Sequence, residues 1–228
     1  MERLHIQRAP EVKGPPLCCL LGSFDPPHLG HERLLGRLLE RFGSLLLLVP
    51  THHFQKQVVP GVNAGYAQRM ELLRAVSDRH GARCGFGRTG IVLFVELWTA
   101  LQERFGRRDI FFGMGDDTHA KVVDSRRYYR RLGQTFGPDQ QRRLEELLRH
   151  IVVFDRSGAA EGGLPVDEDV RWISSTWVRR KVVELRAAGV PPSRWHRELG
   201  AALAPDVIDR ILADDLYTLP PPDAANPF

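Results

Sequence analysis

The chain has 228 residues, 43% of them hydrophobic, and a formal net charge of +4, so it can bury a core of its own. The excess of 32 Lys and Arg over 28 Asp and Glu is too mild to require a nucleic-acid partner, and the longest apolar run, 45–50, is far short of the roughly 20 residues of a membrane span. We therefore expect a cytoplasmic protein that binds neither membrane nor nucleic acid, with three reduced cysteines in its core.

Apolar runs and helical patterns alternate from the start of the chain. The run 17–21 predicts a buried strand that ends at Gly22, and the run 45–49 predicts another. Between them, over 29–42, leucines recur at helical spacing, and Gly43 is a helix stop signal. These segments together predict a βαβ unit.

The alternation continues to the C-terminal part of the chain. The patterns predict helices over 66–80, 93–105, 140–149 and 205–214, a helical stretch through 128–132, a helix that begins at 174–176, and strands at 82–86, 109–114, 151–154 and 166–173. Such alternation is typical of an α/β fold, here a Rossmann-like, doubly wound parallel sheet with helices on both faces. We expect one domain over 1–219 and a proline-rich tail, 220–228, that forms no regular element.

The loop between the first strand and the first helix carries the strongest chemical signal. It reads Gly22-Ser23-Phe24-Asp25-Pro26-Pro27-His28-Leu29-Gly30-His31. Its backbone amides can face a phosphate at the carboxyl edge of the sheet. The two histidines lie three residues apart at the helix start, on one face, where imidazoles can donate hydrogen bonds to a triphosphate.

This loop resembles the GxFxPxHxGH signature of the nucleotidyltransferase superfamily, which includes the nicotinate and nicotinamide mononucleotide adenylyltransferases. A second segment, Ile173-Ser174-Ser175-Thr176-Trp177-Val178-Arg179, resembles the superfamily's ISSTxxR element. Amides and hydroxyls of a first helical turn can hold phosphate oxygens, and the Arg179 guanidinium suits the same phosphates. Ser-Ser-Thr alone is a common helix cap, but in this order after the first motif it predicts a nucleotide site.

Two looser likenesses to the same superfamily extend the predicted site. Lys56 stands where a lysine contacts phosphates, although the chain has Phe-Gln-Lys there in place of Pro-His-Lys. The segment 111–117 resembles a strand that ends in Gly-Ala-Asp, which implies that Gly113 and Gly115 admit the nucleotide and that Asp117 binds ribose hydroxyls. The alternatives are an exposed loop lysine and a glycine turn with a capping aspartate.

Within the superfamily, two further segments resemble the bacterial nicotinate-nucleotide adenylyltransferases in particular, whereas two others differ from them. The segment 67–73, with Arg69-Met70, is similar to their Arg-Met helix, and 203–217 is similar to their final helix and Leu-Tyr ending. In contrast, Val92-Leu93-Phe94 replaces the Ser-Tyr-Thr that helps form their nicotinate pocket, and an arginine-rich stretch with Tyr128-Tyr129 follows Asp117. These departures predict an altered acceptor pocket.

The resemblance implies transfer of a nucleoside monophosphate, AMP from ATP, to nicotinate or nicotinamide mononucleotide with release of pyrophosphate. His28 and His31 are assigned to the α- and β-phosphates, and Lys56, Ser175, Thr176 and Arg179 to the leaving pyrophosphate. Mg²⁺ is the expected cofactor; it would bridge the triphosphate oxygens, with phosphate and water as most of its ligands, and no protein metal site is predicted. The other residues assigned to nucleotide binding are Gly22, Ser23, Phe24, Gly30, Gly113, Gly115, Asp117, Ile173 and Ser174.

Two other functions remain open at this level. One is a cytidylyl- or other nucleotidyltransferase with a different phosphorylated acceptor, which the loss of Ser-Tyr-Thr favours. The other is a nucleotide-binding regulator without turnover, which the intact histidine pair argues against. The sequence fixes neither the acceptor, the base of the triphosphate nor the oligomeric state, and it leaves a homo-oligomer open.

Overall fold

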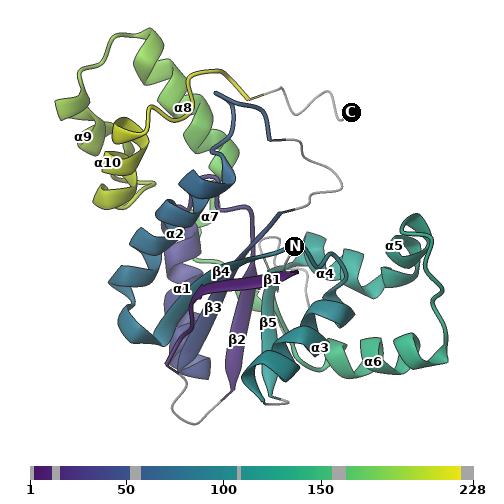
Figure 1. Ribbon diagram of the computed structural model, residues 1–228. Helices are drawn as coiled ribbons and strands as arrows, with labels where there is room; N and C mark the ends of the chain where they lie inside the picture. The colour runs from purple at the N-terminus through teal and green to yellow at the C-terminus, as the bar shows by residue number, and fades with distance from the viewer. Residues whose placement is uncertain (1–2, 12–15, 52–57, 107–108, 156–162, 222–228) are drawn as a thin grey trace.

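A computed structural model describes residues 3–11, 16–51, 58–106, 109–155 and 163–221 (Figure 1). The strands are β1 (Leu4–Arg8), β2 (Leu17–Leu21), β3 (Ser44–Pro50), β4 (Cys84–Thr89), β5 (Ile110–Gly115), β6 (Ile151–Asp155) and β7 (Leu164–Pro165). The α-helices are α1 (Leu29–Phe42), α2 (Tyr66–Arg79), α3 (Phe94–Phe105), α4 (Asp116–Val123), α5 (Ser125–Arg131), α6 (Pro138–Leu148), α7 (Glu168–Arg171), α8 (Ser175–Ala187), α9 (Trp195–Leu199) and α10 (Pro205–Ala213). Two 3-10 helices, η1 (Gly81–Arg83) and η2 (Pro192–Arg194), complete the described elements.

The described strands form one sheet in the order β1-β4-β3-β2-β5-β6-β7. All neighbouring strands are parallel except β1, which runs antiparallel to β4 at the edge. The chain leaves β2 in one direction to β3 and β4 and later returns to the other side of β2 with β5 and β6. The topological switch point therefore lies between β2 and β5, where folds of this kind bind ligands. The predicted fold class is confirmed.

Each face of the sheet is covered by its own set of helices (Figure 1). Cys18 and Leu20 of β2 belong to the core that includes residues of α1, α2, α8 and α10. Leu17 and Cys19 belong to the opposite core, with α3 and α6. Because both faces of the strand are buried, its sequence reads as a continuous apolar run.

The cysteines are free and buried, and burial raises the pKa of Cys18 to about 12. A thiol with such a pKa stays protonated at neutral pH, so it is an inert core residue. The cysteines are therefore the unpaired, small core residues that the sequence predicts.

The strand predicted over 166–173 is wrong. Only 164–165 is extended, as β7, and a short helix, α7, follows. The buried side chains of the segment are Val166, Val170 and Ile173, which are spaced by four and three residues. That spacing does not fit a strand, in which buried side chains recur at every second residue, and the acids at 167–169 make a helix start favourable.

The segment after α10 returns to the region of the predicted site. Leu216 and Tyr217 are buried there, and the amide of Leu219 donates to the carbonyl of Gly61 at 3.0 Å. The last described residues of the chain therefore lie beside the loop that leads into α2. None of the described helices is both long enough and apolar enough to cross a membrane.

Candidate active site

The loop after β2 carries the chain across the carboxyl edge of the sheet and into α1. Its first amide, of Gly22, donates to Leu48 of β3 at 3.0 Å. Phe24 is buried with φ of 46°, an uncommon conformation for a residue with a side chain, and its ring lies 5.2 Å from that of His31. The amide of Leu29, the first residue of α1, donates to Ala202 at 2.8 Å. That amide of the helix start is therefore used inside the protein.

His28 and His31 lie against each other at the start of α1. Their ring centroids are 3.9 Å apart, and the backbone amide of His28 donates to Nδ1 of His31 at 3.2 Å. Because Nδ1 accepts this hydrogen bond, the proton of the neutral His31 ring is on Nε2. His31 therefore presents a donor on the side of the ring away from the backbone, as binding of a phosphate oxygen requires.

The absence of a side chain at Gly30 leaves room for the ring of His28. A Cβ at position 30 would lie 2.9 Å from Cε1 and Nδ1 of the His28 ring, which is itself buried. We expect Gly30→Ala to displace this ring and to lower kcat by about 10- to 100-fold, since small misplacements of a reacting group are costly. The rate of pyrophosphate release measures this effect.

Gly36, in the same helix, is the matched control for this substitution. A Cβ at position 36 meets no atom within 4 Å. Gly36→Ala should therefore leave activity unchanged and stabilise the fold by up to about 1 kcal/mol through helix propensity. Equal activity of the two variants would show that the His28 position does not matter.

The ISSTxxR segment contacts the first motif, although the two are more than 140 residues apart in the sequence. Ser174 caps α8, its Oγ accepting from the amide of Trp177 at 3.1 Å. The Ser175 hydroxyl donates to the carbonyl of Pro26 at 2.9 Å. Arg179 donates through Nη1 to the carbonyl of Asp25 and through Nη2 to Thr176 Oγ1. The start of α8 is thereby fixed against the loop that precedes α1.

A cavity of about 500 Å³ lies where these segments meet, a size typical of small-molecule sites. Of the predicted site residues, it is lined by Gly22, Ser23, Phe24, His28, His31, Gly115, Asp117, Ser174, Ser175, Thr176 and Arg179. Gly30, Gly113 and Ile173 are not on its wall: Gly113 lies within β5, where a Cβ would meet Leu38 and Phe154 at 3.0 Å. Lys56 lies outside the described residues.

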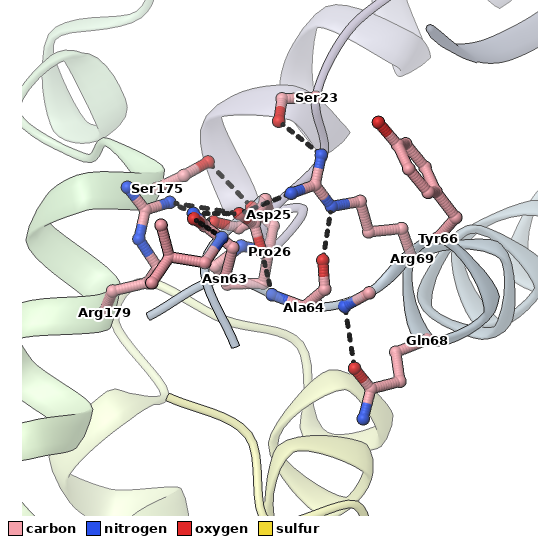
Figure 2. A network of polar contacts seen from close by, with 12 residues as sticks. Ser23, Asp25, Pro26, Asn63, Ala64, Tyr66, Gln68, Arg69, Ser175 and Arg179 are labelled. Atoms are coloured by element: carbon pink, nitrogen blue, oxygen red, sulfur yellow. Dashed lines mark hydrogen bonds and ion pairs between the residues drawn. The ribbon is translucent and has the colours of Figure 1, made fainter. Parts of the chain in front are cut away.

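A buried charge network centred on Asp25 adds residues that the sequence did not assign (Figure 2). Asp25 Oδ1 accepts from the amide of Ala64 at 2.9 Å and from the Tyr217 hydroxyl at 3.0 Å. Oδ2 accepts from Asn63 at 2.8 Å and from Arg69 Nη2 at 3.1 Å. The Arg-Met helix and the Leu-Tyr ending, noted only as family likenesses, thus meet at one carboxylate.

The segments that suggested an altered acceptor pocket lie away from this cavity. Leu93 is buried at the start of α3, and Phe94 packs edge-on against Phe112. Tyr129 is buried against Phe136, beside a separate groove lined by α3 and α6. Neither Tyr128 nor Tyr129 is on the wall of the 500 Å³ cavity.

The sheet, its switch point and the two motifs around one cavity define the class of protein as a nucleotidyltransferase. A family model, cytidylyltransferase-like, matches residues 19–181. The chain therefore belongs to the cytidylyltransferase-like family, and the expected membership of the nucleotidyltransferase superfamily is confirmed. No curated protein matches the chain significantly in sequence.

Solved structures share the fold at low sequence identity. A candidate nicotinate-nucleotide adenylyltransferase from Vibrio parahaemolyticus is 20% identical with a TM-score of 0.55, over 89% of this chain and 94% of that one. The nicotinic acid mononucleotide adenylyltransferase of Plasmodium falciparum, complexed with NaAD, is 13% identical with a TM-score of 0.61, over 90% and 98% of the two chains. The same enzyme complexed with APC gives a TM-score of 0.59 at the same identity and coverage. These likenesses extend over nearly the whole fold.

Proposed function

We propose that this protein transfers AMP from ATP to nicotinate or nicotinamide mononucleotide and releases pyrophosphate. The observation that carries the proposal is the convergence of His28, His31 and Arg179 on the wall of one cavity at the switch point of the sheet. Solved structures of the same fold bind NaAD and APC, which supports the dinucleotide product and the triphosphate substrate as the class of ligand.

In this reaction the residues position the two substrates and stabilise the negative charge on the phosphates. The acceptor phosphate is anionic at neutral pH, so its oxygen attacks the α-phosphorus without a strong base while the bond to the β-phosphate oxygen breaks. The Nε2 donor of His31 and the neighbouring His28 stabilise charge on the α- and β-phosphates. Ser175, Thr176 and Arg179 hold the leaving pyrophosphate, and we assign Lys56 to the same group.

Magnesium fits this arrangement as a cation carried by the triphosphate. Among the described residues, no cluster of three or more His, Cys, Asp or Glu side chains could hold a metal ion. Of the carboxylates on the cavity wall, Asp25 is engaged by Arg69 and its other donors and Asp117 is assigned to the ribose, which leaves Asp116 for the cation. One or two carboxylates with phosphate and water ligands are the usual environment of Mg²⁺, which neutralises phosphate charge when bound.

The acceptor is tested by comparing kcat/KM for the two mononucleotides with ATP. Val92-Leu93-Phe94 lies away from the cavity and carries no side-chain hydroxyl, so it cannot supply the hydrogen bonds that the resemblance places at the pyridine end. We therefore expect both mononucleotides to react, with discrimination between them of only about 10–100-fold, as in a pocket that selects by shape. Turnover of neither mononucleotide would refute this acceptor.

A different phosphorylated acceptor, with CTP or another triphosphate, is the second candidate. The replacement of Ser-Tyr-Thr by apolar residues favours it. Pyrophosphate release measured with each of the four nucleoside triphosphates and a panel of phosphorylated acceptors separates the candidates. A protein that binds triphosphates and releases no pyrophosphate with any pair is instead a nucleotide-binding regulator.

A further inference from the structure

Asp25 is a carboxylate on the cavity wall that the proposed chemistry does not use. It is 1% exposed and lies in the middle of the loop between β2 and α1, residues 22–28, to which we assign phosphate binding and which we call the phosphate-binding loop. Its two oxygens accept four hydrogen bonds, from Ala64, Asn63, Arg69 and Tyr217. A carboxylate with this many donors is held in one orientation. Its position is therefore set by the fold before any ligand arrives.

The network places one negative charge between two positive ones (Figure 2). Arg69 Nη2 lies 3.1 Å from Asp25 Oδ2, and Arg179 Nη1 lies 3.7 Å from the same oxygen. The side chains of Asp25 and Arg69 are almost fully buried, and that of Arg179 is 11% exposed. Removing the carboxylate would leave two guanidinium groups facing each other in a poorly solvated place, which is costly.

The two arginines differ in how they are held. Arg69 donates through Nε to the carbonyl of Ala64 and through Nη1 to Ser23, so its guanidinium is fixed even apart from Asp25. Arg179 has Thr176 and the backbone carbonyl of Asp25 as hydrogen-bond partners, and the Asp25 carboxylate, 3.7 Å away, is its counter-ion. Burial lowers the pKa of Arg179, and the charge of Asp25 opposes that shift. Asp25 thus acts on Arg179 in two ways, through its backbone carbonyl and through the charge of its carboxylate.

Tyr217 connects the C-terminal segment to this carboxylate. Burial, together with the negative charge of Asp25, raises the pKa of Tyr217, so its hydroxyl remains a donor at neutral pH. Arg186 of α8 donates to the carbonyl of the preceding residue, Leu216, at 3.1 Å. The segment after α10 is therefore bound both to α8 and to the phosphate-binding loop.

We propose that Asp25 is a positioning residue that orients Arg179 toward the phosphates and that Tyr217 fixes Asp25 for this task. The inference rests on the proposed role of Arg179 as a phosphate ligand. Asp25 acts through Arg179 rather than by touching the substrate, since its oxygens are already occupied by protein donors. The C-terminal segment is by this contact a part of the site.

A double-mutant cycle between Asp25→Asn and Arg179→Lys tests the proposal. Calorimetry measures the Kd for magnesium pyrophosphate in the wild type, the two single variants and the double variant. We expect each single variant to bind about tenfold more weakly, and the double variant to be only about 10- to 20-fold weaker. A double variant about 100-fold weaker, the product of independent effects, or a folded Asp25→Asn protein with unchanged binding would overturn the proposal.

Tyr217→Phe keeps the proposal testable where Asp25→Asn does not fold, as judged by circular dichroism. It removes one donor to Asp25 and leaves every charge in place. We expect binding about threefold weaker than wild type, and no further loss when Arg179 is already Lys. Tyr129→Phe, at a buried tyrosine beside the separate groove, should bind as wild type does. Wild-type binding by Tyr217→Phe would contradict the proposal.

The binding measurement also separates this proposal from the proposed function. It needs no turnover, so a protein that binds pyrophosphate but transfers no nucleotide refutes only the proposed reaction. An active enzyme in which the two effects are independent refutes only the role of Asp25. A wild-type protein that does not bind pyrophosphate overturns the assignment of Arg179 and this inference together.

Discussion

His31→Ala should lower kcat by about two to three orders of magnitude. This is the usual loss when one preorganised donor to transition-state charge is removed. The geometry behind the prediction is the hydrogen bond from the His28 amide to His31 Nδ1, which leaves the ring proton on Nε2. The measurement is steady-state pyrophosphate release at saturating triphosphate and acceptor.

His31→Asn separates catalysis from the capping of α1. The Asn carbonyl oxygen can still accept from the His28 amide, whereas Ala leaves that amide without this partner at a cost of about 1 kcal/mol. Stability should therefore return in the Asn variant while activity does not. His196→Ala, at a half-exposed histidine on α9, is the control and should be fully active. Near-normal pyrophosphate release by a folded His31→Asn protein would remove His31 from the mechanism.

The central sheet and the helices around it were predictable because burial leaves a plain pattern in the chain. β2 and β3 are covered on both faces, so they read as uninterrupted apolar runs. β1 was missed, since it is a short antiparallel edge strand with only Leu4 and Ile6 as apolar residues and is defined by its pairing with β4. α7 was taken for a strand because four residues are too few to establish a period.

In the candidate site, too, the contiguous motifs were predictable, whereas contacts between residues distant in the sequence were not. The histidine pair and the start of α8 are contiguous motifs that the sequence shows directly, and both line the 500 Å³ cavity. The partners of Asp25 come from positions 38 to 192 residues further along the chain, so no local pattern identifies them. Arg69 and Tyr217 were visible as family likenesses, but their chemistry is given only by the contact with Asp25.

Arg179→Lys should lower kcat/KM for the triphosphate by about 10- to 100-fold although the charge is kept. Lysine has no planar fork and cannot reproduce two donors in fixed directions. In the structure these directions are set by the Asp25 carbonyl and by Thr176, from which Arg179 Nη2 is 3.2 Å distant. Loss of one hydrogen bond to a charged group, about 1.5–3 kcal/mol, accounts for the expected range.

Arg180→Lys is the matched control, since Arg180 follows in the same helix and is not on the cavity wall. It should retain wild-type kcat/KM, because its charge is preserved and no ligand contact is assigned to it. Both variants are compared with the wild type across triphosphate concentrations, with circular dichroism to establish folding. If Lys serves as well as Arg at position 179, the planar fork is not used, and the assignment of the leaving pyrophosphate to the start of α8 is wrong.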